Sequence, residues 1–174
     1  MPRSPSSLPA LGTLLCAAAL ALGATAPAQA RGRLHFNNGA GTGGAVASGP
    51  RGVMARGHTI QQNADGSVTS ASGGGFVGAN GARGYRGGTT TQGADGSLTR
   101  SGSAGVSGAR GSAQSSGSFS RSADGTWSGS RSSSATSSAT GKSYSGSTTI
   151  DPTTGKPVHS GGCTDASGQS VACH

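Results

Sequence analysis

The stretch NADGSVT at residues 63–69 decides the predicted fold because it recurs along the chain. It returns as GADGSLT at residues 93–99 and as SADGTWS at residues 122–128. Asp-Gly pairs form tight turns because glycine adopts a positive φ at no steric cost and the aspartate side chain bonds to the nearby backbone. We therefore interpret three pairs as the turns of repeated β-hairpins: Asp65 with Gly66, Asp95 with Gly96, and Asp124 with Gly125.

The larger side chains around these turns indicate a loop of three residues. A type I turn followed by a left-handed glycine pairs Gln62 with Val68 and places Ile60 on the same face as Val68. A loop of two residues would divide such side chains between the two faces, because side chains alternate along a strand. The same register groups Thr90 with Leu98 in the second copy, and in the third it groups Phe119 with Trp127 and sets Arg121 opposite Trp127.

A second class of turn is predicted between these hairpins. Asn80-Gly81-Ala82-Arg83-Gly84 recurs as Ser107-Gly108-Ala109-Arg110-Gly111. The shorter Ala55-Arg56-Gly57 lies 27 residues before Ala82-Arg83-Gly84. Further turns are expected near Gly141, at residues 151–155 and at residues 165–168. Such spacing leaves strands of about eight to ten residues, which predicts an all-β antiparallel meander of stacked Gly/Ser-rich hairpins.

The composition leaves an alternative open. The chain has 34 glycines and only 3% aromatic residues, so it lacks the side chains for an ordinary core. Helices are unfavourable because glycine costs about 1 kcal/mol relative to alanine in a helix. A largely disordered chain is the alternative to the thin sheet.

The sequence divides into four parts. Residues 1–30 have a basic start, an apolar run and a small-x-small site, which is typical of a cleavable signal peptide. Residues 31–56 are expected to be a flexible Gly-rich leader, and residues 57–150 the repeated β-hairpin region. Residues 151–174 are expected to form a C-terminal hairpin closed by a disulfide between Cys163 and Cys173.

The formal net charge is +8, from 13 Lys and Arg against five acidic residues. Positive charge of this size favours association with anionic surfaces. The candidate anion-binding residues are Arg83, Arg86, Arg110 and Arg121. Arg83 to Gly88 resembles the Arg-Gly-Gly tracts of RNA-binding tails, and the alternative is a Gly-rich turn flanked by solubilising arginines.

No catalytic, cofactor-binding or metal-binding set is predicted. His159, Ser160 and Asp151 offer the residue types of a hydrolase triad, but a nucleophilic serine needs a rigidly packed base and oxyanion site. All five acids stand where turns require them. A zinc site of two cysteines with His159 and His174 is the rival of the disulfide, although its spacing is not that of the usual fingers.

These observations predict an exported, non-enzymatic protein of the bacterial envelope or extracellular space, periplasmic or secreted, with a structural or adhesive role. The alternatives are a binding module for anionic polymers, such as polysaccharide, lipopolysaccharide or extracellular DNA, and a self-associating fibril subunit. We expect no small-molecule substrate and no stable membrane insertion after signal cleavage. In composition, residues 57–174 are similar in a general way to bacterial envelope and extracellular matrix repeats.

Overall fold

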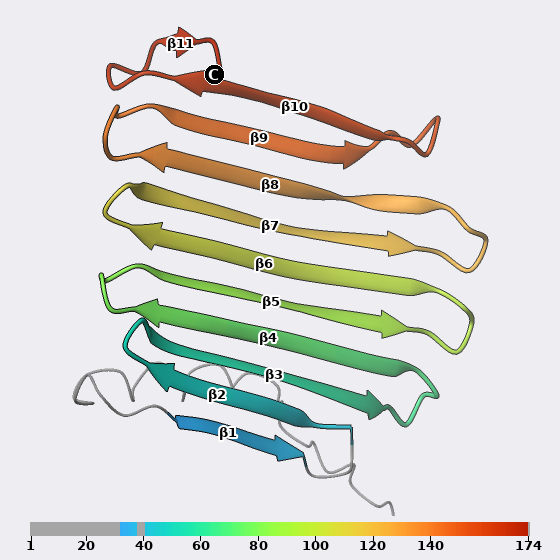
Figure 1. The fold of residues 1–174 in the computed structure, drawn as a ribbon. Helices are drawn as coiled ribbons and strands as arrows, with labels where there is room; N and C mark the ends of the chain where they lie inside the picture. Colours follow the sequence, from blue (N-terminus) through green and yellow to red (C-terminus); the bar gives the residue numbers. More distant parts are fainter. Residues whose placement is uncertain (1–31, 38–40, 174) are drawn as a thin grey trace, which may run out of the picture.

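The computed structural model describes residues 32–37 and 41–173, and the predicted signal peptide lies outside them. These residues form one open antiparallel sheet whose strands follow the order of the chain, which confirms the all-β meander (Figure 1). The strands are β1 (Gly32–Asn37), β2 (Gly43–Gly49), β3 (Gly52–Gln62), β4 (Val68–Gly78), β5 (Arg83–Gln92), β6 (Leu98–Gly108), β7 (Gly111–Arg121), β8 (Trp127–Ser137), β9 (Ser143–Ile150), β10 (Pro157–Thr164) and β11 (Ser170–Val171).

The three Ala-Asp-Gly hairpins have the predicted register. In the first hairpin Gln62 pairs with Val68, and the Asn63 amide donates to the Ser67 carbonyl at 2.8 Å. Gly66 has a φ of 81°, which is the left-handed conformation that this loop requires. Gly96 and Gly125 have φ values of 84° and 90° in the equivalent loops. The repeat therefore encodes one turn geometry three times.

The turns on the opposite side of the sheet differ from the sequence prediction. Ala55-Arg56-Gly57 lies inside β3 rather than in a turn, and the turn that precedes β3 is formed by residues 50–51 between the paired Gly49 and Gly52. The two copies of the Gly-Ala-Arg-Gly motif also form different loops. Residues 79–81 make a three-residue loop with left-handed Gly81, whereas residues 109–110 make a two-residue loop. The motif is shared, but its first glycine follows the end of β4 in one copy, whereas in the other copy it is the last residue of β6.

Residues 31–56, expected to be a flexible leader, contain two strands and the start of a third. β1 pairs with β2 along its whole length, and β2 pairs with β3. The expectation failed because glycine-rich composition indicates a loop, whereas strand pairing uses backbone groups that every non-proline residue carries. The predicted boundary at residue 57 falls inside β3.

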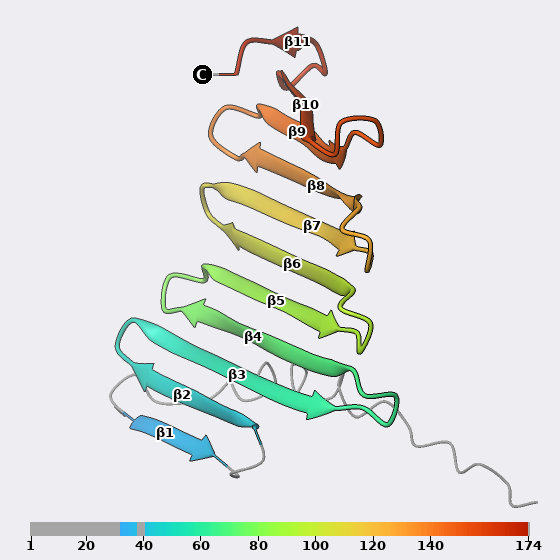
Figure 2. The same cartoon turned by 90° about the vertical axis from the view of Figure 1, so that its right-hand side faces the viewer.

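The sheet is a single layer, and no other part of the described chain lies against it (Figures 1 and 2). None of the hydrophobic residues described by the structure is buried. Phenylalanine and tyrosine side chains instead cover glycines across the strands: Phe76 pairs with Gly84 and Phe119 with Gly129. A Cβ on Gly84 would lie 2.5 Å from Phe76 Cε1, so the ring occupies the space of the missing side chain. The large rings thereby obtain apolar contact without a second layer.

The register divides the sheet into two faces. The side of β6 to β9 that we call the hydroxyl face carries Thr99, Ser101, Ser103, Ser107, Ser112, Gln114, Ser116, Ser118, Ser120, Ser128, Ser130, Ser132, Ser134, Thr136, Ser143, Ser145, Ser147 and Thr149. Its hydroxyls bond between strands, as in Ser120 with Ser128 at 2.9 Å. The opposite side, which we call the basic face, carries Arg33, Met54, Arg56, His58, Ile60, Val68, Phe76, Arg86, Leu98, Arg100, Val106, Phe119, Arg121, Trp127, Arg131, Tyr144 and His159.

Candidate anion-binding face

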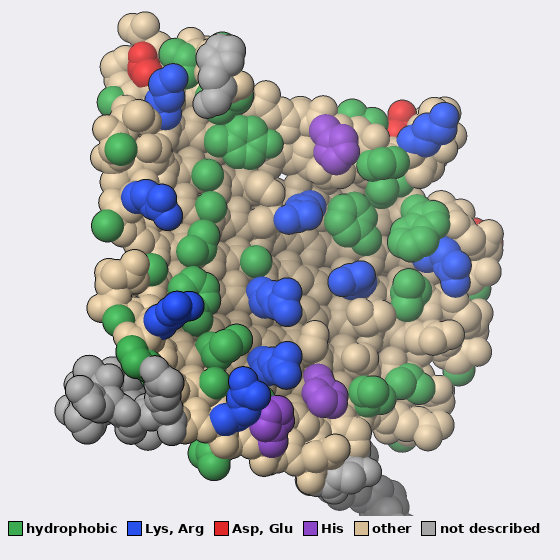
Figure 3. Space-filling model, viewed as in Figure 1, with side chains coloured by type: hydrophobic (Ala, Val, Ile, Leu, Met, Phe, Trp, Pro, Cys, Tyr) green, Lys and Arg blue, Asp and Glu red, His purple; other side chains and the backbone are tan. Residues whose placement is uncertain are grey.

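Arginines from different hairpins meet on the basic face. Arg56 lies in β3, Arg86 in β5, Arg100 in β6 and Arg131 in β8, and strand alternation directs all four to the same side. Figure 3 shows cationic side chains over the middle of this face, with hydrophobic side chains gathered toward both turn edges. The face therefore has a cationic centre, and its margins carry most of the large hydrophobic side chains together with further cations.

Glycines form much of the surface between these arginines. Arg56 pairs with Gly74, and Gly74 pairs with Arg86, so the two guanidinium groups rise from either side of a residue with no side chain. A Cβ on Gly74 would lie 3.1 Å from Arg56 Cβ, and a Cβ on Gly117 would lie 2.8 Å from Arg131 Cβ. Because these glycines have no side chain, they leave space beside the backbone for the aliphatic parts of the arginine side chains.

The acidic residues lie in turns rather than on the strands of the basic face. The chain has five acids, and each of the aspartates accepts a hydrogen bond from its own turn. Hydrogen bonds from the Ser67 hydroxyl and amide hold the pKa of Asp65 below its ordinary value. The amide and hydroxyl of Thr126 likewise lower the pKa of Asp124. The carboxylates thus stay ionised at neutral pH and stabilise turns.

The four arginines predicted from the sequence do not form one cluster. Arg86 lies on the basic face, and Arg121 lies at its margin, 6.0 Å from the Trp127 ring centroid. Arg110 lies in the turn between β6 and β7. Arg83 points to the opposite side of the sheet, where its Nε donates to the Ser107 hydroxyl at 3.2 Å.

Four further residues of this face were not predicted from the sequence as site residues: Arg56, Arg100, Arg131 and His58. The signal that identifies them is residue parity carried across every turn, since each loop length determines which face the next strand presents. The turn predicted near residue 55 placed Arg56 outside a strand, and the undetermined length of the loop near residue 108 left the face of Arg131 open. The predicted register of the second hairpin, in contrast, already places Arg100 on the same side as Arg86.

The C-terminal cysteines form the predicted disulfide. Cys163 and Cys173 are bonded, with their Cα atoms 5.4 Å apart, and the bond ties the end of the chain to β10. Their thiols are therefore unavailable as zinc ligands, and His174 lies outside the described residues. Within residues 32–37 and 41–173 no group of three metal-ligating side chains comes together.

The residue types of a hydrolase triad are separated by the sheet. His159 is on the basic face with its Nδ1 2.7 Å from the Thr148 hydroxyl, whereas Ser160 points to the other side and bonds Ser147 at 2.9 Å. Asp151 accepts the Thr153 amide at 2.7 Å in the β9–β10 turn. These three side chains are not assembled into a nucleophile and its base.

Comparisons of the chain with protein-family models, curated proteins and solved structures gave no match. Among the residues that the structure describes, no helix is long and apolar enough to span a bilayer.

Proposed function

We propose that this chain is an exported, non-enzymatic protein of the bacterial envelope or extracellular space that holds anionic polymers on its basic face. The observation that carries the proposal is the segregation of charge. Arginines from four separate strands share one side of the sheet, and the aspartates are confined to turns.

An extended single-layer sheet suits a long ligand better than a small one. Strands lie about 4.8 Å apart, so Arg56 and Arg86, two strands apart in one row, present charges roughly 10 Å apart along the sheet. A polysaccharide or nucleic acid chain crossing the strands can meet several such charges in succession. Release of its counterions then supplies affinity that falls as salt rises.

Two arginines of β5 provide a matched test. Arg86→Gln and Arg83→Gln remove the same charge from the same strand, but from opposite sides of the sheet. We expect Arg86→Gln to weaken binding of heparin, used as an anionic probe, by about threefold, since an exposed charge contact is worth up to about 1 kcal/mol. Arg83→Gln should leave the affinity within error of the unaltered chain. Equal weakening by both variants would show that net charge, rather than this face, determines binding.

The export part of the proposal is supported by the signal-like residues 1–30 and by the disulfide, because disulfides persist in oxidising compartments. Fractionation of the source cells, with N-terminal sequencing of the recovered chain, tests it. We expect mature protein that begins near Arg31 in the periplasmic or extracellular fraction. Full-length protein confined to the cytoplasm would contradict export.

Self-association is a second candidate, favoured by the open edges of the sheet. β1 is the first strand, and β11 covers only Cys163 and Thr164 of β10, which leaves the outer side of Pro157–Gly162 without a partner strand in the described sheet. Unpaired strand edges can add strands from other copies. Sedimentation of concentrated protein should then reveal growing assemblies with added sheet signal, and a chain that stays monomeric for days excludes this role.

A further inference from the structure

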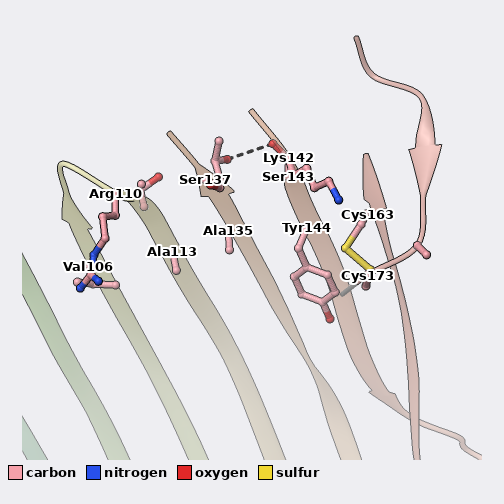
Figure 4. Close-up of a pocket in the computed structure, with 14 residues that line it drawn as sticks. Val106, Arg110, Ala113, Ala135, Ser137, Lys142, Ser143, Tyr144, Cys163 and Cys173 are labelled. Carbon is pink, nitrogen blue, oxygen red and sulfur yellow. Dashed lines mark hydrogen bonds between the residues drawn. A yellow bond between two sulfur atoms is a disulfide. The ribbon is translucent and has the colours of Figure 1, made fainter. Parts of the chain in front are cut away.

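An apolar hollow lies at one end of the basic face and is separate from the arginine-rich centre. Its volume is about 390 Å³, and Figure 4 shows the side chains that line it. Ala113 pairs with Ala135, and these two short side chains form its floor. Larger side chains flank them, with Val106 opposite Ala113 on β6 and Tyr144 opposite Ala135 on β9. The alternation of large, small, small and large side chains creates the hollow.

The C-terminal disulfide completes the wall beside Tyr144. Cys163 pairs with Tyr144, and Cys173 and Ala172 also line the hollow. The Tyr144 ring lies over glycines of its own and the adjacent strand, since a Cβ on Gly161 would meet the phenol oxygen at 3.0 Å. The wall therefore consists of the Tyr144 ring, which lies over glycines of the sheet, and of the Cys163–Cys173 disulfide.

Two cations stand at the turn end of the hollow. Arg110 extends from the β6–β7 turn along Val106, and Lys142 comes from the turn that precedes β9 (Figure 4). Asp165 follows the strand beside Lys142, but its carboxylate accepts hydrogen bonds from Ser167 and Gln169 within its own turn. The two cations outnumber this one carboxylate, so the mouth of the hollow favours an anionic group.

We propose that this hollow binds the acyl chain of an anionic amphiphile, with its carboxylate or phosphate headgroup held at the turn edge by Arg110 and Lys142. Apolar surface removed from water provides the driving force for the acyl chain, and Tyr144 in the wall of the hollow is 40% exposed. The two cations select the charged headgroup over a neutral one. The inference does not depend on polymer binding, because the hollow uses neither Arg56 nor Arg86.

The test uses calorimetric titration of the 174-residue chain with dodecanoate, dodecyl phosphate and neutral dodecyl maltoside, each below its micelle concentration. We expect saturable binding of at least one anionic probe, and binding of the neutral probe about fivefold weaker. Dodecanoate alone would identify a carboxylate headgroup, dodecyl phosphate alone a phosphate headgroup, and either result supports the site. Failure of both anionic probes to bind, or equal affinity for the maltoside, overturns it.

Replacing one of two alanines on opposite sides of the sheet by phenylalanine tests where the acyl chain binds. Ala135→Phe fills the floor of the hollow, and Ala71→Phe adds the same bulk on the other side of the sheet in β4. Ala135→Phe should weaken acyl binding at least tenfold, whereas Ala71→Phe and Arg86→Gln should not change it. Circular dichroism and disulfide content confirm that each variant is folded. Unchanged binding by a folded Ala135→Phe chain would place the ligand elsewhere and refute the proposal.

Discussion

Two glycines close to Trp127 should respond very differently to the same substitution. Gly125 lies in the third Ala-Asp-Gly turn with a φ of 90°, and a Cβ added there meets nothing within 4 Å. Gly129 lies in β8 with a φ of 137°, and its added Cβ would lie 2.6 Å from Phe119 Cα. Gly125 is therefore required only for its positive φ, whereas Gly129 is required both for its positive φ and because a Cβ at this position has no space.

The cost of each change follows from this difference. Gly125→Ala should lower the free energy of unfolding by about 1–2 kcal/mol, the cost of a left-handed alanine. Gly129→Ala adds a backbone clash to a conformation that is nearly exclusive to glycine, so we expect a loss of about 4 kcal/mol or more. Gly162→Ala is the control, because its φ is not in the left-handed region and its Cβ meets nothing within 4 Å.

Denaturant unfolding followed by Trp127 emission and by circular dichroism measures all three variants. Gly162→Ala should be neutral or slightly stabilising, because alanine restricts the unfolded chain. Equal effects of Gly125→Ala and Gly129→Ala would refute the reasoning, because they would mean that β7 and β8 do not approach as the register requires.

Three further outcomes are expected. Hydrogen bonds lower the folded pKa of Asp65, Asp95 and the other turn aspartates below 3.8, so the ionised carboxylates stabilise the hairpins above that pH. This stability is lost as the pH falls through the folded pKa values. Thermal melts between neutral and strongly acid pH should show the loss, and a melting temperature that does not change with pH would contradict it. Reduction of the Cys163–Cys173 bond should cost up to about 3 kcal/mol and release the β11 amides to hydrogen exchange while those of β9 stay protected. Trp127→Phe should cost only about 0.5 kcal/mol, because Trp127 is 42% exposed and Arg121 is 6.0 Å from its ring; a loss above 2 kcal/mol would indicate a packed core.

The hairpin turns could be predicted from the sequence because their geometry is local. Asp-Gly with a following strand restricts the loop to a few backbone conformations, so the pairing of Gln62 with Val68 follows from a handful of residues. The strands of residues 32–49 could not be predicted in this way. β2 consists mostly of glycine and alanine, so its sequence carries no strong alternation, and it is ordered by backbone pairing to β1 and β3.

The basic face could be predicted only in part, because it depends on parity across distant turns. Arg83 and Arg86 are three residues apart on one strand, so they point to opposite sides, and this much is visible in the sequence. That Arg56 joins Arg86 across Gly74 depends on the β3–β4 and β4–β5 loop lengths together. An error of one residue in either loop would move an arginine to the other face.

Arginine footprinting tests the central claim most directly, namely that one side of this sheet is the anion-binding surface. Phenylglyoxal modification, mapped by mass spectrometry with and without heparin, reports the exposure of every arginine in a single experiment. We predict that heparin slows the modification of Arg56, Arg86 and Arg100, which share the basic face, and leaves the modification rate of Arg83, on the opposite side, unchanged. Equal protection of Arg83 and Arg86, or no protection at any arginine, would contradict the account.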